Sequence, residues 1–265
     1  MDAVLQTAPL PVLAGGLFVA LLAARELGGW LAGRRPRGQD ETQGYVLSGV
    51  LGLLALLIAF TFGLALDRYE TRRELVVAEA SAIGTAVMRV RLLDPPAADE
   101  LDRLYREYVM LRTRYGHADA ARKPPLAKAS ADLRTRIESA MLAAAAPIRT
   151  TPLAALVVPA VNESLDVGVA REAAHAARLP ASVIAALAIY ALVAAGVLGS
   201  TLATAARPHR RSVAMMFLLL TLALGLILDL DRPQGGTVRI SQAPLDELAA
   251  ELAARPPPSA ASPPR

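Results

Sequence analysis

Hydrophobic residues along the chain are gathered into four long runs that carry no charge. The runs are Ala3 to Ala24, Tyr45 to Leu66, Leu179 to Ala206 and Ser212 to Leu228. An α-helix rises about 1.5 Å per residue and the hydrocarbon core of a bilayer is about 30 Å thick, so roughly 20 residues span it. The first three runs are long enough, and the fourth suffices if Asp229 lies at the interface or the helix packs against neighbours. The pattern predicts four transmembrane helices.

The second run continues into a helical pattern without interruption. Beyond Leu66, apolar residues recur three, four or seven residues apart, at Tyr69, Val76, Ala80, Ile83, Val87 and Val90. This spacing is typical of a packed helical seam, and Gly84 interrupts it only weakly, at about 1 kcal/mol relative to Ala. Helix-ending residues come at Pro95 and Pro96. The second helix is therefore predicted from Tyr45 to about Leu93, roughly 70 Å long, so that half of it projects from the membrane.

The segment after this helix predicts a bundle outside the membrane. One helix begins at Pro95 and ends near Gly116, a second spans about Leu126 to Ala146, and a third runs from Leu153 to Arg178 and leads into the third span. Each has an apolar face, so these helices need one another to bury it. Near the C-terminus, Pro244 to Arg255 can form a short amphipathic helix, and the proline-rich residues after it are expected to be a disordered tail.

The predicted fold class is all-α: a polytopic membrane protein with four transmembrane helices and an extramembrane helical bundle between the second and the third. The chain then divides into a first transmembrane hairpin (1–66), the bundle that continues the second span (67–178), a second transmembrane hairpin (179–230) and a C-terminal segment (231–265) with its short helix and tail. Arginines flank both sides of the spans in nearly equal number, so the positive-inside rule leaves the orientation of the bundle open.

Composition excludes several classes of function. The net charge is +4 and the isoelectric point is near 9.7, but the arginines are interleaved with acids and form no compact basic patch, so nucleic acid is not an expected partner. The absence of cysteine excludes disulfides, thiolate metal sites and Cys nucleophiles. His117, His175 and His209 fall in separate predicted elements, and no phosphate-binding glycine loop, zinc-protease motif or nucleophile elbow occurs. We expect no catalytic residues, no cofactor and no metal, and therefore no enzyme.

Three arginines follow the uncharged second span directly: Arg68, Arg72 and Arg73. Repeated by each subunit of an oligomer, they would form the mouth of a pore and concentrate anions there. Alternatively, an interfacial arginine extends its side chain to the headgroups and is followed by solvated ion pairs, such as Glu70 with Arg73. Both interpretations stay open.

Polar residues of the bundle and of the last span are expected to form a structural network. They are Asn162, Glu163, Asp166, Arg171, Asp229, Asp231 and Arg232. Asn162 and Asp166 lie four residues apart, share a helix face and could meet arginines of the extended second helix. Acids at membrane depth are costly, so Asp229 and Asp231 are expected at the interfacial end of the fourth span, paired with Arg232.

Small residues form stripes in two of the predicted spans. The second span carries Ser48, Gly52, Ala55, Ala59 and Gly63, and the third carries Ala191, Ala195 and Gly199. Close backbone approach drives helices together in lipid, so these stripes are predicted packing faces. The pattern does not distinguish packing within a subunit from packing between subunits.

Two long segments of the chain have a distinctive sequence: "DRYETRRELVVAEASAIGTAVMR" (Asp67–Arg89) and "LILDLDRPQGGTVRISQAPL" (Leu226–Leu245). They resemble the post-span and C-terminal signatures of a family of bacterial membrane proteins called bestrophin-like. A third segment, "VNESLDVGVAR" (Val161–Arg171), aligns Asn162, Glu163, Asp166 and Arg171 with the family pattern. Together with four spans and a helical insertion, the resemblance covers nearly the whole chain.

The resemblance implies a multi-pass protein of the bacterial inner (cytoplasmic) membrane, surrounded by membrane lipid and assembled as a homo-oligomer. The family is similar, more distantly, to the bestrophins, which are pentameric anion channels. In these the second span lines a narrow apolar neck and continues as a helix with a segment similar to Asp67-Arg68-Tyr69. The resemblance therefore implies an anion as ligand. It also places the bundle in the cytoplasm, opposite to the charge bias of the first helix.

Two hypotheses about function follow. The leading one is an oligomeric channel that passes anions, with Arg68, Arg72 and Arg73 at the pore mouth. The alternative is a non-conducting membrane scaffold or sensor whose bundle binds a protein partner. A pore needs the second-span helices to surround an axis, whereas a scaffold can bury that helix within its own subunit.

Overall fold

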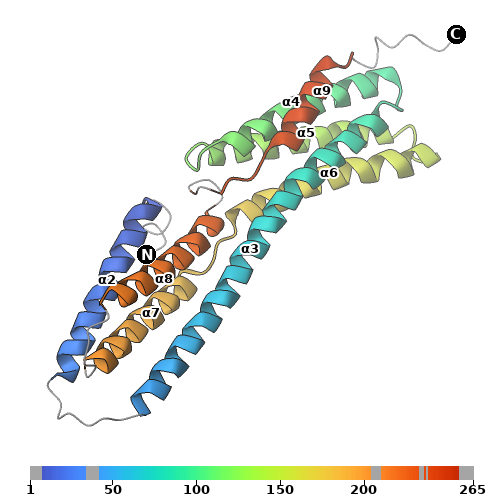
Figure 1. The fold of residues 1–265 in the computed structure, drawn as a ribbon. Helices are drawn as coiled ribbons and strands as arrows, with labels where there is room; N and C mark the ends of the chain where they lie inside the picture. Colours follow the sequence, from blue (N-terminus) through green and yellow to red (C-terminus); the bar gives the residue numbers. More distant parts are fainter. Residues whose placement is uncertain (1–7, 34–41, 204–209, 233–235, 237, 257–265) are drawn as a thin grey trace. The chain divides into compact units, whose positions relative to one another are not determined.

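The chain folds into α-helices. The computed structural model describes residues 8–33, 42–203, 210–232, 236 and 238–256, and within these ranges it contains helices and no strand (Figure 1). The helices are α2 (Leu10–Ala32), α3 (Thr42–Val90), α4 (Pro95–His117), α5 (Lys123–Ala145), α6 (Pro152–Ala176), α7 (Ala181–Leu202), α8 (Arg210–Asp231) and α9 (Ala243–Ala254). The all-α prediction is confirmed. The predicted disordered tail after Pro256 lies outside the described residues.

These helices form two compact units. The first, here called the membrane unit, comprises Met1–Tyr69 and Arg178–Arg239; the second, the bundle, comprises Glu70–Ala177 and Ile240–Arg265. The chain changes unit within α3, between α6 and α7, and before α9. The predicted divisions after residues 66 and 178 fall close to these places. The bundle, however, also takes α9 from the predicted C-terminal segment 231–265.

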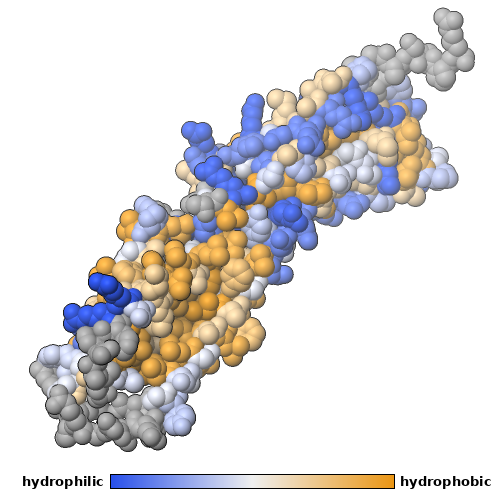
Figure 2. All heavy atoms as spheres, viewed as in Figure 1, coloured by the Kyte–Doolittle hydropathy of each residue, from blue (hydrophilic) through white to orange (hydrophobic). Residues whose placement is uncertain are grey.

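Four helical stretches of the described chain are long and apolar enough to cross a membrane. They include α2, the first half of α3, α7 and α8, in agreement with the four predicted spans. Hydrophobic residues cover most of the visible surface around α2, α7 and α8 (Figure 2). The first span differs in position from its uncharged run, because α2 begins after Pro9 and continues to Ala32. It thus includes Arg25, which pairs with Glu26. Proline is well suited to the first positions of a helix, which fits this start.

Inside the membrane unit, α2 packs closely against α7. A Cβ atom added to Gly28 would overlap with the carbonyl oxygen of Gly196, and one added to Gly199 would overlap with that of Arg25. The two backbones are therefore in contact, as small residues permit in membrane helices. Ala191 and Ala195 are buried. The small-residue stripe of the third span is thus a packing face within the chain.

The bundle is built around the second half of α3. Val76, Ile83 and Val87 of this helix are buried in one hydrophobic core with side chains of α4, α5, α6 and α9. From α9 the core receives Leu245 and Leu248. The seam predicted from the spacing of apolar residues is therefore the buried side of α3. This arrangement leaves the opposite side of the helix uncovered by the bundle core.

Candidate functional site

One side of α3 is exposed along the membrane unit. The small-residue stripe of the second span (Ser48, Gly52, Ala55, Ala59 and Gly63) is exposed at every position. A Cβ atom added to Gly52 or Gly63 would meet no other atom within 4 Å. On the other side of the helix, Leu54, Thr61 and Ala65 are buried. In contrast to the stripe on α7, this one lies open on the single chain.

The same side stays open as α3 enters the bundle. Continuing three, four or seven residues at a time from Gly63, it passes through Leu66, Glu70, Arg73, Val77, Ser81 and Met88. An α-helix has 3.6 residues per turn, so these positions lie one above another on one side. Glu70 is half-buried and the others are exposed. A continuous open side therefore runs along most of α3.

The three arginines after the second span point in different directions. Arg72 is 3% exposed; its Nε donates to the carbonyl oxygen of Ala174 at 3.1 Å and its Nη2 to that of Ala177 at 2.7 Å. It thereby binds carbonyls at the C-terminal end of α6 that the helix itself leaves unpaired. Arg68 is half-buried. Arg73 is exposed, and its Nε lies 3.3 Å from Glu70 Oε2. The structure therefore does not bring the three together.

The charges on the open side of α3 near this point are mostly negative. Asp67 and Glu74 are exposed, and the Glu70 side chain is 44% exposed. Arg73, with a side chain 60% exposed, is the basic residue among them. The arrangement offers more carboxylates than guanidinium groups to anything that approaches this side of the helix.

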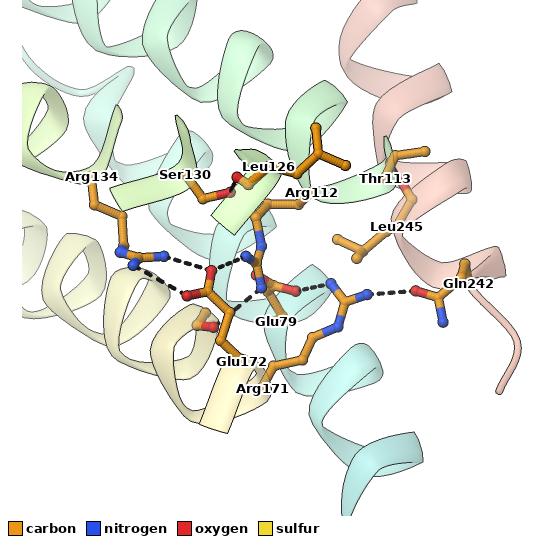
Figure 3. Close-up of polar contacts among 11 residues, drawn as sticks. Glu79, Arg112, Thr113, Leu126, Ser130, Arg134, Arg171, Glu172, Gln242 and Leu245 are labelled. Atoms are coloured by element: carbon orange, nitrogen blue, oxygen red, sulfur yellow. Dashed lines mark hydrogen bonds and ion pairs between the residues drawn. The ribbon is translucent and has the colours of Figure 1, made fainter. Parts of the chain in front are cut away.

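A buried network of charged side chains lies inside the bundle (Figure 3). Glu79 of α3 is completely buried, and its two carboxylate oxygens contact arginines of two other helices. Oε1 accepts from Arg112 Nε at 2.5 Å, and Oε2 pairs with Arg171. Arg112 also donates to the Gly168 carbonyl oxygen at 3.2 Å. Glu79 thus ties α3 to α4 and α6.

The network continues from both arginines. Arg112 pairs with Glu172, which also receives Arg134 Nη1 of α5 at 2.9 Å. Arg171 Nη2 donates to Gln242 Oε1, just before α9, at 2.5 Å. Figure 3 shows Arg112 between the two glutamates and Arg171 between Glu79 and Gln242. Buried charges are tolerated when they are paired and hydrogen-bonded, so this network holds the elements of the bundle in one arrangement.

Burial and charge shift the protonation of groups in the bundle core. Burial lowers the pKa of Arg112, but attraction to Glu79 and Glu172 outweighs it, so the pKa lies above its usual value and the guanidinium stays charged. Tyr105 hydrogen-bonds Ser164 Oγ at 2.7 Å, and burial raises the pKa of its phenol well above the usual value. The bundle core therefore stabilises the charged form of Arg112 and the neutral form of Tyr105.

Comparison with known proteins decides the family. Residues 14–245 match the model of the Bestrophin-like domain. The chain belongs to the Bestrophin-like family. A crystal structure of a bacterial bestrophin homolog from Klebsiella pneumoniae, carrying a point mutation, has a similar fold: the TM-score is 0.62 at 15% identity, over 90% of this chain and 98% of that one. No protein with a curated description matches. The Bestrophin-like resemblance of the sequence is confirmed.

The structure distributes the predicted polar network of this Bestrophin-like chain over three places. Arg171 joins the buried network. Asn162, Glu163 and Asp166 are exposed on α6. The remaining three residues of the prediction lie in the membrane unit, at the end of α8.

At this end of α8, acids bind backbone groups. Asp231 Oδ1 accepts from the amide of Leu179 at 2.9 Å, and Asp229 Oδ2 accepts from that of Val238 at 3.2 Å. Arg232 Nη1 donates to the carbonyl oxygen of Ala8 at 2.8 Å. These contacts fix the segments that precede α7 and follow α8. Among the described residues, no group of three or more His, Asp or Glu side chains is arranged to hold a metal ion.

Five members of the network were not predicted from the sequence: Glu79, Arg112, Arg134, Glu172 and Gln242. A signal for Glu79 was present, because it follows Val76 by three residues and precedes Ile83 by four, so it falls on the buried side of α3. A charged residue at a core position indicates a buried partner of opposite charge. The identity of that partner depends on how separate helices pack.

Proposed function

We propose that this Bestrophin-like protein is an oligomeric ion channel in which the open side of α3 faces a common axis. The observation that carries the proposal is the exposed small-residue stripe of the second span, which the other spans leave uncovered while they bury the stripe on α7. Small residues allow close approach of membrane helices, and closed rotational symmetry brings the same helix of each subunit to one axis. A homo-oligomer in membrane lipid is part of this proposal.

The charges on α3 support cations as the permeating ions. The anion pore expected from the sequence requires free arginines at the mouth, but Arg72 binds carbonyl oxygens of its own chain. On the open side, Asp67, Glu70 and Glu74 outnumber Arg73. Rings of carboxylates favour cations and rings of arginines favour anions. The proposed pore therefore prefers cations, and an anion ligand remains the competing outcome of the test.

The test is the reversal potential across a potassium chloride gradient, with purified protein in planar bilayers. We expect the reversal potential to lie close to the equilibrium potential of potassium. Neutralising two exposed acids, Asp67→Asn with Glu74→Gln, reduces this preference because it removes two negative charges from each subunit. Arg73→Gln increases it. Glu100→Gln, an exposed change on α4, is the matched control and leaves the potential unchanged. A reversal potential close to the equilibrium potential of chloride, if Arg73→Gln abolishes it, would instead establish the anion pore.

The alternative is a non-conducting scaffold or sensor whose bundle binds a protein partner. A groove of about 450 Å³ between α4 and α5 favours it. The groove is lined by apolar side chains, including Met110 and Leu133, and by charged ones, including Arg114 and Asp132. Folded, inserted protein that is monomeric by native mass spectrometry and carries no current would favour the scaffold over the channel.

The proposed location is the inner membrane of a bacterial cell. It is supported by the four apolar helices, by the family match, and by the similarity of the fold to that of a bacterial bestrophin homolog. Separation of inner and outer membranes on a density gradient, followed by detection of the tagged chain, tests it. Recovery in the outer-membrane fraction would overturn this location.

A further inference from the structure

We infer that the end of the membrane unit where α2 ends and α8 begins binds the phosphate group of an anionic phospholipid. Arg25 of α2 is the central residue of this site, and Arg210 and Arg211 of α8 lie at the same end of the unit. The inference needs only that the apolar helices lie in a membrane, so it depends neither on conduction nor on an assembly around α3.

Arg25 is a charged residue inside the first apolar helix. It lies about 10 Å along α2 from the end of the helix at Ala32, at 1.5 Å per residue. Trp30 comes between them, is 53% exposed, and is a residue type that commonly lies at the lipid headgroups. An arginine near the end of a membrane helix extends its side chain toward that level. The guanidinium of Arg25 is therefore placed at the depth of lipid phosphate groups.

The guanidinium of Arg25 has one donor without an acceptor. Its Nη1 pairs with Glu26, but its Nε is buried and makes no hydrogen bond to any residue that the structure describes. A buried donor without an acceptor destabilises a fold, and an oxygen supplied by the surrounding lipid would remove this penalty. The Arg25 side chain is 11% exposed, so an acceptor can approach it from the surface. Arginine often binds phosphate through two parallel N–H groups, which suits such an acceptor.

Two more arginines lie at the same end of the membrane unit. The backbone of Arg25 lies against Gly199 of α7, where an added Cβ atom would overlap with the Arg25 carbonyl oxygen. Helix α7 ends within one turn of Gly199, and after a short connection α8 begins at Arg210. Arg210 and Arg211 are exposed, and neither makes a hydrogen bond or ion pair within the described part of the chain. Both are therefore available to a ligand at this end.

An anionic phospholipid fits these groups by charge and by shape. The three arginines outnumber Glu26, the acid that pairs with Arg25, so the excess charge of the four residues is positive. Basic pockets between membrane helices bind the headgroups of anionic lipids. Exposed apolar side chains on the same two helices, such as Val19 of α2 and Met215 of α8, offer a surface to the acyl chains. A soluble phosphate ester presents the same oxygens without acyl chains, so the test separates the two sources.

Native mass spectrometry of the full chain in detergent, after removal of lipid, tests the inference. Phosphatidylglycerol, phosphatidylcholine and soluble glycerol 3-phosphate are added in separate titrations, and the dissociation constant of each is measured from the bound fraction. The variants are Arg25→Gln and the double change Arg210→Gln with Arg211→Gln. Arg239→Gln is the matched control, because Arg239 is an exposed arginine of the same unit that follows α8. Circular dichroism reports whether each variant is folded.

We expect phosphatidylglycerol to bind more tightly than phosphatidylcholine. Arg25→Gln weakens phosphatidylglycerol binding at least about tenfold, because a hydrogen bond between charged groups is lost. The double change on α8 also weakens it, and Arg239→Gln leaves it unchanged. Equal binding of the two lipids would overturn the inference, and so would phosphatidylglycerol binding that neither Arg25→Gln nor the double change alters. Glycerol 3-phosphate that binds as tightly as phosphatidylglycerol would overturn the lipid as the source of the phosphate. If Arg25→Gln does not fold, the exposed double change decides the result.

Discussion

Replacing Glu79 by glutamine measures how much the buried network stabilises the bundle. Glu79 is fully buried and binds Arg112 with one oxygen and Arg171 with the other. Glutamine has nearly the same size as glutamate but carries no charge. Its NH2 group faces the N–H donors of one of the two arginines, so the hydrogen bond to that arginine is lost. Breaking a buried ion pair costs about 3–5 kcal/mol. Arg112 keeps Glu172 and Arg171 keeps Gln242, so we expect the lower end, about 3 kcal/mol.

Hydrogen exchange of the full chain in detergent is the assay, because it resolves the bundle from the membrane unit. A loss of about 3 kcal/mol corresponds to roughly 150-fold faster exchange of the protected amides, since 1.4 kcal/mol is a factor of ten. The effect is expected in α4 and α6, and exchange in α2 and α7 serves as the internal reference. Glu163→Gln, the same change at an exposed position of α6, is the matched control and leaves exchange unchanged.

A change of less than about fivefold, or about 1 kcal/mol, would refute the reasoning. It would mean that water or a rearranged side chain satisfies both arginines, and that the apolar core alone determines the stability of the bundle. Faster exchange in α2 and α7 to the same extent would also contradict it, because the network has no member in the membrane unit.

Three further predictions concern other contacts. Gly28→Ala forces α2 away from the Gly196 carbonyl oxygen, and we expect it to lower the free energy of unfolding by about 1–3 kcal/mol. The loss is measured as a lower melting temperature in detergent. The control Gly15→Ala places its Cβ where nothing lies within 4 Å, so it leaves the melting temperature unchanged. Arg72→Gln removes donors from two carbonyl oxygens at the end of α6 and is expected to raise amide exchange in its last turn at least about tenfold, with unchanged exchange as the contrary result. Because burial raises the pKa of Tyr105 above its ordinary value of 10.0, its contribution to stability is complete below pH 10.0 and is lost as the pH rises further. Its tyrosinate absorbance should therefore develop together with loss of helix in alkaline titration, and ionisation of every tyrosine before any helix is lost would contradict this.

The long second helix could be predicted from the sequence because two independent patterns agree on it. An uncharged run sets the span, and the seam at Val76, Ile83 and Val87 continues it without a helix-breaking residue. Both are properties of one segment, so no knowledge of its neighbours is needed. The structure accordingly gives Thr42–Val90 for a helix expected from Tyr45 to about Leu93.

Partners of particular side chains could not be predicted in the same way. Asn162 and Asp166 have the spacing of a helix face, but spacing alone does not tell which face is buried, and both are exposed. Glu79 and Arg112 lie far apart in sequence and meet because α3 and α4 pack side by side. Pairing across helices depends on the rotation of each helix about its axis, which a single sequence leaves undetermined.

The two small-residue stripes illustrate the same limit. Gly199 on α7 and Gly63 on α3 occur in similar patterns, yet the first contacts α2 and the second meets nothing within 4 Å. Small residues permit close approach but do not specify what approaches. Only the folded chain distinguishes an internal packing face from an open one.

The long helix α3 is a single element from Thr42 to Val90 and contains no proline, so its backbone passes from the membrane unit into the bundle without a loop. The same helix carries the open small-residue stripe in the first unit and Glu79, which binds Arg112 and Arg171, in the second. A fragment made to isolate either unit would therefore have to end inside α3.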